Sequence, residues 1–411
     1  MIPFNRPHLT GDELRYIEQA HRSGHLSGDG FFTKQCHAKL EEMIGCRKAM
    51  LTHSCTAALE MAAILLDIQP GDEVIVPSFT FVSTANAFAL RGGIPVFVDI
   101  RADTLNIDER LIEEAITPRT KAICVVHYAG VGCEMDAIMD IAERHGLRVV
   151  EDAAQGINAH YKGRPLGSIG HLAALSFHET KNIICGEGGA LLINDAQFVE
   201  RAEIIREKGT NRSRFFRGQV DKYRWVDLGS SFLPGEVNAA FLLAQLEHAD
   251  AITRRRERIW RSYQAWFQSI ADSRLKLPTV PNHCAHNGHI FQLLLPHRSD
   301  GAKFIAAMRN KDVQTVFHYA PLHSSPGGQR YGRAHGDLAV TDAVSERLVR
   351  LPLWLGVEDH LPEIFRAIEA ALPSSARTLT PWPVASMLES LASISMREPV
   401  GPDRSICFPS S

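Results

Sequence analysis

The order of apolar segments between residues 50 and 189 limits the fold of this chain more than any other feature of its sequence. Short apolar runs recur in this part of the chain, at residues 72–76, 95–99, 122–127, 148–151 and 172–177. Helical patterns lie between them, such as residues 136–145, which end at Gly146, a residue type that commonly terminates a helix. Strands that alternate with helices form a largely parallel sheet with helices on both faces. The pattern therefore predicts an α/β fold.

Three polar segments follow strands of this predicted sheet, at the edge where ligands of such sheets bind. In residues 52–59, small and hydroxyl residues lead into an Ala- and Leu-rich helix. The free N–H groups of that helix start, with the Thr56 hydroxyl, suit a phosphate, although N-capping by Ser54 or Thr56 explains this segment better when it is taken alone. In residues 77–81, Phe81 follows a strand and could stack on a heteroaromatic ring, although most such aromatics are core residues.

Asp152 directly follows the apolar run 148–151, so we expect its carboxylate to be partly buried and to need a partner. A helix N-cap explains this fragment equally well. Lys181 lies in the segment 176–182, between the apolar runs 172–177 and 190–193, and glycines follow it. A desolvated lysine loses its proton more readily and can form a Schiff base, and glycine allows a flat ligand to approach. By itself, this segment is better explained as a surface lysine in a glycine-rich turn.

Together, these parts predict a single site. A phosphate cradle, an aromatic ring, a carboxylate and a lysine all project from one edge of one sheet, and this set suits pyridoxal 5'-phosphate (PLP). The lysine would bind the cofactor covalently, and the carboxylate would keep the pyridine nitrogen protonated, so that the ring withdraws electrons.

Composition excludes several other classes of protein. The formal net charge of -3 gives no electrostatic attraction to nucleic acid or to anionic membranes, and no apolar run reaches membrane-spanning length. We expect no secretory signal, because no basic segment followed by an apolar one opens the chain. The 8 cysteines form no C-x-x-C pair, so we expect reduced thiols and a cytoplasmic protein. The 19 histidines show no metal-ligand spacing, which predicts that there is no metal site.

We predict three parts along the chain. Residues 1–255 form a large domain that includes the N-terminal segment, residues 256–374 a smaller α+β domain, and residues 375–411 a Pro- and Ser-rich tail that is poorly ordered. Within the smaller domain we expect strands at residues 289–295 and 313–318. Residues 236–270 are expected to form one long helix, and the irregular segment 209–229, rich in Arg and aromatic residues, is expected to contact a partner such as a second subunit.

Several long runs are characteristic of a known family. They are residues 2–5, 54–56, 66–74, 81–88, 150–156, 176–182 and 206–212. Over about residues 1–373 the chain resembles the nucleotide-sugar aminotransferases, PLP enzymes of fold type I. The resemblance implies a large domain with a mostly parallel sheet, a smaller C-terminal α+β domain, and a homodimer with the active site at the subunit interface.

The resemblance also implies roles for individual residues. Lys181 would form the Schiff base and move the proton between C4 of the sugar and C4′ of the cofactor. Asp152 would pair with the pyridine nitrogen, while Gln155 would contact the ring hydroxyl side and Phe81 would stack on the ring. The remaining expected contacts are Cys55, Thr56 and Ser176 to the phosphate, Ser231 to the phosphate of the neighbouring subunit, and His323 to the substrate. Many relatives carry Asn in place of Ser231.

The resembling family transfers an amine to a keto sugar. We therefore expect transamination of dTDP-4-dehydro-6-deoxy-D-glucose with L-glutamate, by ping-pong kinetics. An enzyme of the same fold that acts at C3, or on a UDP-linked sugar, is the alternative; dehydratase relatives carry histidine in place of the lysine. A non-enzymatic regulator is a third possibility, but no helix-turn-helix segment or basic domain supports it. His178 either forms local hydrogen bonds at the strand end or contacts the sugar, and we favour the local hydrogen bonds.

Overall fold

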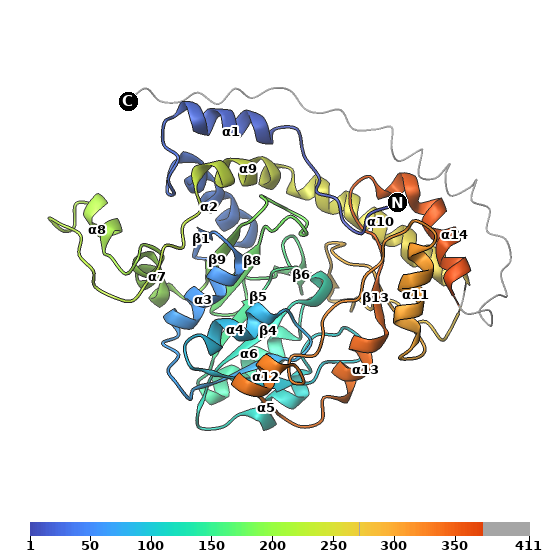
Figure 1. Cartoon of the computed structure of the whole chain (residues 1–411). Coiled ribbons are helices and arrows are strands. Elements are labelled where there is room, and N and C mark those ends of the chain that lie inside the picture. Colours follow the sequence, from blue (N-terminus) through green and yellow to red (C-terminus); the bar gives the residue numbers. More distant parts are fainter. Residues whose placement is uncertain (271, 373–411) are drawn as a thin grey trace.

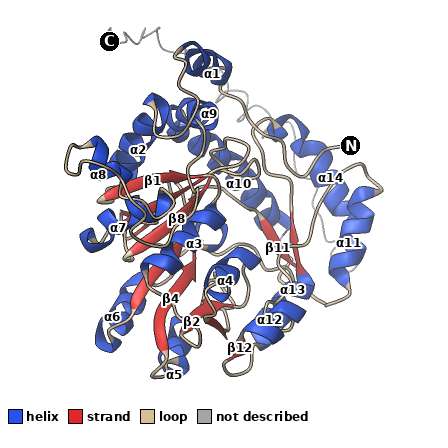
Figure 2. Cartoon of the chain, turned by 60° about the vertical axis from the view of Figure 1, so that its left-hand side comes forward, coloured by secondary structure: helices blue, strands red, loops and turns tan. Residues whose placement is uncertain are grey.

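The largest element of the computed structural model, which describes residues 1–270 and 272–372, is a sheet of eight strands. The strands lie in the order β1-β9-β8-β5-β4-β2-β3-β12 (Figure 1, Figure 2). Their bounds are β1 (Lys48–Thr52), β2 (Glu73–Pro77), β3 (Ile94–Val98), β4 (Thr120–Val126), β5 (Arg148–Asp152), β8 (Leu172–Ser176), β9 (Gly189–Ile193) and β12 (Arg333–Ala334). The predicted α/β fold is confirmed. The predicted tail, residues 375–411, lies outside the described residues.

The sheet is mostly parallel, as predicted, with one antiparallel strand near one end. The strands β5, β4, β2 and β3 run parallel to their neighbours, as does the pair β5 and β8. However, β9 runs antiparallel to both β8 and β1. As a result, Gly189 at the start of β9 lies opposite Ser176 at the end of β8 and opposite Thr52 at the end of β1. Three chain segments therefore meet at one edge of the sheet.

Helices cover both faces of the sheet. Alternate strand residues point to opposite faces: Val74 and Val76 pack with α3, α4 and α7, whereas Ile75 packs with α5 and α6. The second face continues under α2 and α9. Helix bounds are α1 (Glu13–Arg22), α2 (Phe31–Ile44), α3 (Cys55–Leu65), α4 (Val82–Ala89), α5 (Ile112–Ala115), α6 (Met135–His145), α7 (Val199–Arg206), α8 (Arg212–Phe216), α9 (Glu236–Glu247), α10 (Ala249–Ile270), α11 (Asp300–Arg309), α12 (Pro326–Tyr331), α13 (Ala339–Arg347) and α14 (Leu361–Ala371).

The C-terminal part contains a second, small sheet. Here β11 (Gln292–Leu294) pairs antiparallel with β13 (Leu348–Arg350), next to α11, α13 and α14 (Figure 1). The strand expected at 313–318 is absent, because this segment pairs only through isolated bridges, such as Val316 with Arg350. The helix expected over 236–270 is two helices, α9 and α10, which meet at His248. Because α10 runs through residues 255 and 256, the two predicted domains share this helix. The division at that point stays a prediction.

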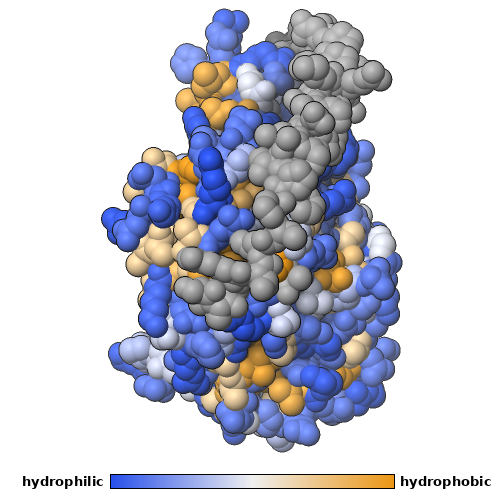
Figure 3. Space-filling view, turned by 90° about the vertical axis from the view of Figure 1, so that its right-hand side faces the viewer, coloured by the Kyte–Doolittle hydropathy of each residue, from blue (hydrophilic) through white to orange (hydrophobic). Residues whose placement is uncertain are grey.

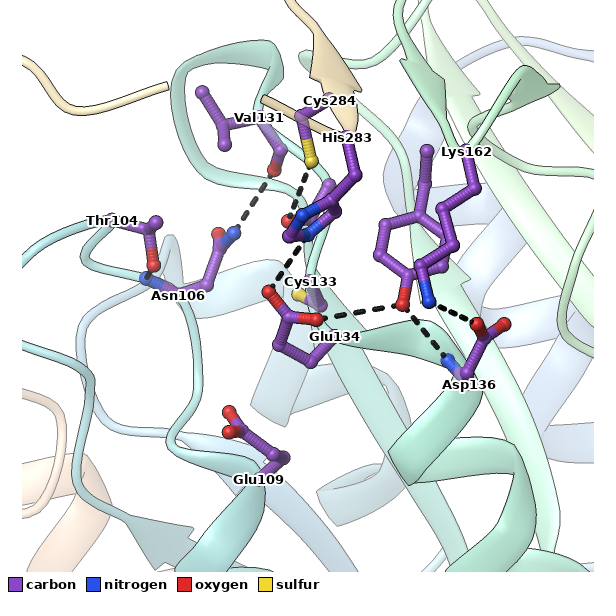
Figure 4. Close-up of polar contacts among 12 residues, drawn as sticks. Thr104, Asn106, Glu109, Val131, Cys133, Glu134, Asp136, Lys162, His283 and Cys284 are labelled. Atoms are coloured by element: carbon purple, nitrogen blue, oxygen red, sulfur yellow. Dashed lines mark hydrogen bonds and ion pairs between the residues drawn. The ribbon is translucent and has the colours of Figure 1, made fainter. Parts of the chain in front are cut away.

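A three-stranded sheet attaches the chain leaving α10 to the large sheet. Its strands are β6 (His160–Tyr161), β7 (Arg164–Pro165) and β10 (Cys284–Ala285). Polar contacts reinforce it (Figure 4): Glu134 accepts from Tyr161 at 3.4 Å and lies 3.0 Å from His283 Nε2, and Lys162 donates to Asp136 at 2.6 Å. This attachment brings residues after 285 back toward the edge of the sheet.

One face of the protein is mostly polar. The face in Figure 3 is largely hydrophilic, with apolar side chains in small separate patches. Among the helices of the described residues, none has the length and apolar character needed to cross a membrane.

Candidate active site

Lys181 lies in the connection between β8 and β9 and lines a cavity of about 780 Å³. Backbone hydrogen bonds shape this connection: Phe177 N donates to Gly188 O at 2.8 Å, and Lys181 N donates to His178 O at 2.9 Å. Burial lowers the pKa of Lys181, and the nearby Cys55 and Asp152 raise it less. A lysine with a lowered pKa spends more of its time as the neutral amine, the form that attacks a carbonyl carbon.

Asp152 ends β5 and lines the same cavity, with its side chain almost completely buried. Thr84 Oγ1 donates to Asp152 Oδ2 at 2.7 Å, and Ala154 N donates to Oδ1 at 3.2 Å. Burial raises the pKa of Asp152, while these two bonds and the charge of Lys181 lower it. A buried carboxylate held in this way is stabilised by a positively charged N–H donor placed against it.

The start of α3 forms a group of hydrogen-bond donors beside the lysine. Ser54 caps this helix, since its Oγ accepts from Ala57 N at 3.1 Å, as the N-cap explanation requires. Thr56 Oγ1 lies 2.8 Å from Ser83 Oγ, and both residues line the cavity. Cys55 and Ser176 complete this wall. Unpaired N–H groups of a helix start, surrounded by hydroxyl groups, form a site for an anion such as a phosphate.

Gly189 allows the strand and the helix to approach each other. A Cβ at this position would collide with the backbone of Ser54 and Cys55 at the start of α3. Only glycine therefore fits at this position. Gly189, one of the glycines that follow Lys181 in the sequence, therefore allows the anion site and the lysine to lie in one cavity.

Two further residues of the predicted site also line the cavity. Gln155 Oε1 accepts from Ala129 N at 2.7 Å, and its Nε2 donates to Tyr319 Oη at 2.8 Å, so its amide is held in one orientation. Phe81 precedes α4 at the cavity wall, and its side chain is 57% exposed. An aromatic ring with this exposure is free to stack on a ligand.

Ser231 and His323 are not among the residues that line the cavity. Ser231 is exposed and forms a backbone bridge with Glu207. His323 Nδ1 lies 2.8 Å from Ser78 Oγ, and Ser78 does not line the cavity either. His318 lines the cavity instead, with its ring stacked on Tyr319. His178 also lines the cavity, and its Nδ1 lies 2.8 Å from Thr180 Oγ1, so a local partner accounts for it.

Several cavity residues were missed in the sequence because they come from distant segments. Asn182 Oδ1 lies 2.8 Å from His289 Nδ1, and Arg256 donates to the backbone carbonyls of Gly288, His289 and Leu353. Arg350 joins the wall from β13. Arg256, His289 and Arg350 belong to no local motif, and His289 lies 107 positions after its partner Asn182, the last residue of the lysine segment 176–182. The only sequence signal for these residues is a polar side chain next to apolar residues in the C-terminal part.

The residues present fit PLP. The cofactor needs an amine for its aldehyde, an acid for its ring nitrogen and donors for its phosphate. Lys181, Asp152 and the start of α3 supply these three, in one cavity. Within the described residues, no group of histidine, cysteine and acidic side chains could hold a metal ion.

Comparisons with known proteins agree with this chemistry. The model of the DegT/DnrJ/EryC1/StrS aminotransferase family matches residues 7–369. The spore coat polysaccharide biosynthesis protein SpsC of Bacillus subtilis is 34% identical over 379 residues, which cover 89% of this chain and 96% of that protein. Among solved structures, the aminotransferase TlmJ of Streptoalloteichus hindustanus has a TM-score of 0.83 at 29% identity, and covers 90% of this chain and 98% of its own. The sugar aminotransferase Spr1654 of Streptococcus pneumoniae, described as putative and solved in a PMP-form, also has a TM-score of 0.83, at 27% identity, and the match covers 90% of this chain and 100% of that one.

The extent of these matches decides the family and confirms the expected fold type and cofactor. The family model spans nearly all of the described residues, and the same neighbour has also been solved in a PLP-form. The chain belongs to the DegT/DnrJ/EryC1/StrS aminotransferase family and is a PLP-dependent sugar aminotransferase of fold type I.

Proposed function

We propose that this protein transfers the amine of L-glutamate to C4 of dTDP-4-dehydro-6-deoxy-D-glucose. The products are dTDP-4-amino-4,6-dideoxy-D-galactose and 2-oxoglutarate. The observation that carries the transamination is Lys181, whose amine faces the same cavity as the buried carboxylate of Asp152 and the anion site of α3. The choice of sugar is supported by the long runs at residues 66–74, 81–88 and 206–212, which resemble dTDP-4-amino-4,6-dideoxygalactose transaminase of enterobacterial common antigen synthesis.

Each group of cavity residues would have a separate role in this transamination. PLP, when bound, supplies a ring that withdraws electrons from the reacting carbon. Asp152, oriented by Thr84, holds a proton at the ring nitrogen. Lys181 Nζ takes the proton from the donor carbon that bears the amine, and in the second half-reaction it gives a proton to C4 of the sugar. The N–H groups and hydroxyls at the start of α3 hold the phosphate.

We also propose that two copies of the chain form a homodimer and that its partner subunit completes each site. Figure 1 shows α8 and the chain around it projecting from the body of the protein. This projection carries exposed apolar side chains, with Trp225 78% and Phe216 70% exposed. A second subunit that packed on the projection would cover them and would bring a segment such as the one containing Ser231 to a neighbouring cavity.

The seven cysteines of the described residues form no disulfide bond, which supports the expected cytoplasmic location.

The experiment that tests the proposed function is identification of the product. Purified protein is incubated with PLP, L-glutamate and dTDP-4-dehydro-6-deoxy-D-glucose, and the sugar product is analysed by NMR. We expect an amine at C4 with the galacto configuration, and no product with Lys181→Ala. Parallel incubations with a 3-keto sugar and with a UDP-linked 4-keto sugar serve as alternatives. A product from either of these, without a product from the proposed substrate, would reject the proposed acceptor.

A further inference from the structure

His289 lies shortly before β11, lines the cavity that contains Lys181, and has one polar atom without a partner. Its backbone N donates to Asn287 Oδ1 at 3.1 Å, its carbonyl oxygen accepts from Arg256 at 3.0 Å, and its Nδ1 lies 2.8 Å from Asn182 Oδ1. Within residues 1–270 and 272–372, the other ring nitrogen, Nε2, forms no hydrogen bond. Protein atoms do not enclose this nitrogen, so it is accessible from the cavity.

The contacts of Asn182 decide which ring nitrogen of His289 carries the proton. Asn182 Nδ2 donates to the carbonyl oxygen of Asn287 at 3.0 Å, so the amide nitrogen faces that carbonyl and the amide oxygen faces His289. An amide oxygen only accepts hydrogen bonds, so the proton lies on His289 Nδ1. In a neutral imidazole the other nitrogen is then an acceptor. Nε2 therefore offers a lone pair to the cavity.

The surroundings of His289 keep its ring neutral and restrict what Nε2 can bind. Burial lowers the pKa of His289 well below 6.5, and the positive charges of Lys181, Arg256 and Arg350 lower it further. No carboxylate of the described residues is among the charges that act on this ring. An ammonium group at Nε2 would meet these positive charges, whereas a neutral hydroxyl would not. The position therefore favours an O–H donor.

His289 lies at the end of the cavity where the lysine reacts. Its partner Asn182 directly follows Lys181 in the chain, and Lys181 is the charge with the largest effect on the pKa of His289. Asp152 raises the pKa values of Lys181 and Cys55 but does not act on His289. Nε2 thus borders the end of the cavity at Lys181, away from the acid that would face the cofactor ring nitrogen.

We propose that His289 Nε2 accepts a hydrogen bond from the hydroxyl group next to the reacting carbonyl of the keto sugar. The carbonyl carbon reacts at Lys181, and this hydroxyl is bonded to the adjacent carbon, so its partner has to lie beside the lysine. In dTDP-4-dehydro-6-deoxy-D-glucose it is the 3-hydroxyl, because C5, the other neighbour of C4, carries the methyl group and the ring oxygen. His289 would thereby select sugars that carry this hydroxyl. The inference rests on the proposed function in taking a keto sugar as the amine acceptor.

The test compares acceptors in the second half-reaction alone. The enzyme with its cofactor in the amine form is mixed with a keto sugar, and absorbance follows the return of the cofactor to the PLP form. The acceptors are dTDP-4-dehydro-6-deoxy-D-glucose and its 3-deoxy and 2-deoxy analogues. We expect the wild type to react with the 3-deoxy analogue about tenfold less efficiently than with the full sugar, because a buried acceptor loses its donor.

Two variants show whether this discrimination comes from His289. His289→Phe keeps a ring of similar size and removes the acceptor, so the full sugar should react about tenfold less efficiently and the 3-deoxy analogue should be unaffected. The ratio of the full sugar to the 2-deoxy analogue should stay as in the wild type. His289→Gln, whose amide oxygen can accept, should recover part of the loss. The donor half-reaction with L-glutamate involves no hydroxyl and should keep its rate in both variants.

Calorimetry provides a measurement without reaction. The PLP form has no amine to transfer to a keto sugar, so the heat of mixing reports binding alone. His289→Phe should lower the affinity of this form for dTDP-4-dehydro-6-deoxy-D-glucose about tenfold and leave the affinity for the 3-deoxy analogue unchanged.

Controls separate hydroxyl binding from a structural role. His283→Phe replaces a nearby histidine that pairs with Glu134 and does not line the cavity, so it should leave both half-reactions unchanged. Equal losses in both half-reactions of His289→Phe would overturn the inference, because the ring would then support Lys181 and not the sugar. A wild-type enzyme that used the 3-deoxy analogue as well as the full sugar would also overturn it, whether or not the variants fold.

Failure of the proposed acceptor gives a different result. If dTDP-4-dehydro-6-deoxy-D-glucose does not react but a 3-keto or UDP-linked sugar does, the proposed acceptor is rejected. The analogue of the reacting sugar that lacks the hydroxyl next to its carbonyl then decides the result for His289 by the same comparison.

Discussion

The buried carboxylate of Glu151 accepts four hydrogen bonds, and we predict that Glu151→Gln destabilises the sheet edge that carries the site. Glu151 is completely buried in β5. Its Oε1 accepts from the backbone N–H groups of Ile169 at 2.7 Å and Gly170 at 2.6 Å. Its Oε2 accepts from Gly167 N at 2.8 Å and lies 2.8 Å from His127 Nε2. Each oxygen thus serves two donors.

Glutamine at this position would leave donors unpaired in either orientation. If its NH₂ group faced Ile169 and Gly170, both N–H groups would lose their acceptor. If it faced His127, the imidazole could not adapt by exchanging its proton, because its Nδ1 accepts from Cys133 N at 3.2 Å. A hydrogen bond to a charged group contributes about 1.5–3 kcal/mol. Two lost bonds, offset in part by removal of a buried charge, predict a loss of about 3 kcal/mol.

Urea unfolding of the wild type and of Glu151→Gln measures this loss. Glu134→Gln is the matched control, since this glutamate also lies close to a histidine, His283, but is partly exposed, and an exposed pair contributes about 0–1 kcal/mol. Because Asp152 follows Glu151 directly in β5, the variant should also release PLP more readily, which dialysis followed by absorbance detects.

The pH dependence of stability gives a second measurement. Burial raises the pKa of Glu151, but the hydrogen bond from His127 and those from the backbone outweigh burial and hold it below the ordinary value of 4.5. A carboxyl whose pKa is lowered by folding stabilises the protein above its ordinary pKa, and this contribution is lost as pH falls through the folded value. Glu151→Gln should therefore lose less stability than the wild type below pH 4.5. A loss at neutral pH no larger than that of Glu134→Gln would refute the reasoning.

Three further predictions concern the cofactor and the partner subunit. Burial lowers the pKa of Lys181, so the rate at which PLP recombines with the apoprotein should fall as pH decreases through that lowered pKa. Stopped-flow absorbance measures this rate as a function of pH. A rate that fell only around the ordinary lysine pKa of 10.5 would contradict the prediction. Gly189→Ala should weaken PLP binding about tenfold or more, equivalent to about 1.4 kcal/mol, because the alanine Cβ would collide with the start of α3. Titration of the apoprotein with PLP measures this loss. Gly327→Ala is the control and should have no effect in the titration, because a Cβ at residue 327 meets nothing within 4 Å. Replacement of Trp225 and Phe216 by Ser should shift the chain from dimer to monomer in sedimentation, and a dimer unchanged by both substitutions would reject the proposed interface.

Local sequence patterns determined the class of the fold. The apolar runs that became β2, β3, β4, β5 and β8 were each located to within two residues, because a buried strand bounded by polar residues is visible in a short window. The same holds for Asp152, which directly follows such a run, and for Lys181, which lies four residues after the run 172–177. Residues at strand ends of one sheet edge are brought together by the fold itself, so their convergence was predictable once the fold class was known.

The tertiary structure decided what depends on pairing between distant segments. Nothing in the local pattern of residues 190–193 shows that β9 runs antiparallel to both neighbours, yet this direction places Gly189 against the start of α3. In residues 313–318 the apolar pattern resembles a strand, but the segment is drawn to the cavity wall and pairs with Arg350 only at one bridge. His318 then reaches the cavity and His323 does not.

The candidate cofactor site follows from local sequence patterns, whereas the rest of the cavity depends on contacts between distant segments. The sequence by itself predicted the lysine, the carboxylate and the anion site, because each lies within a few residues of a strand that any short window reveals. Only the tertiary structure placed Arg350 and His289 beside Lys181, from segments more than 100 positions further along the chain. The physical reason is that strand-end positions follow from local periodicity, whereas the approach of β13 to the sheet edge depends on the packing of the whole C-terminal part.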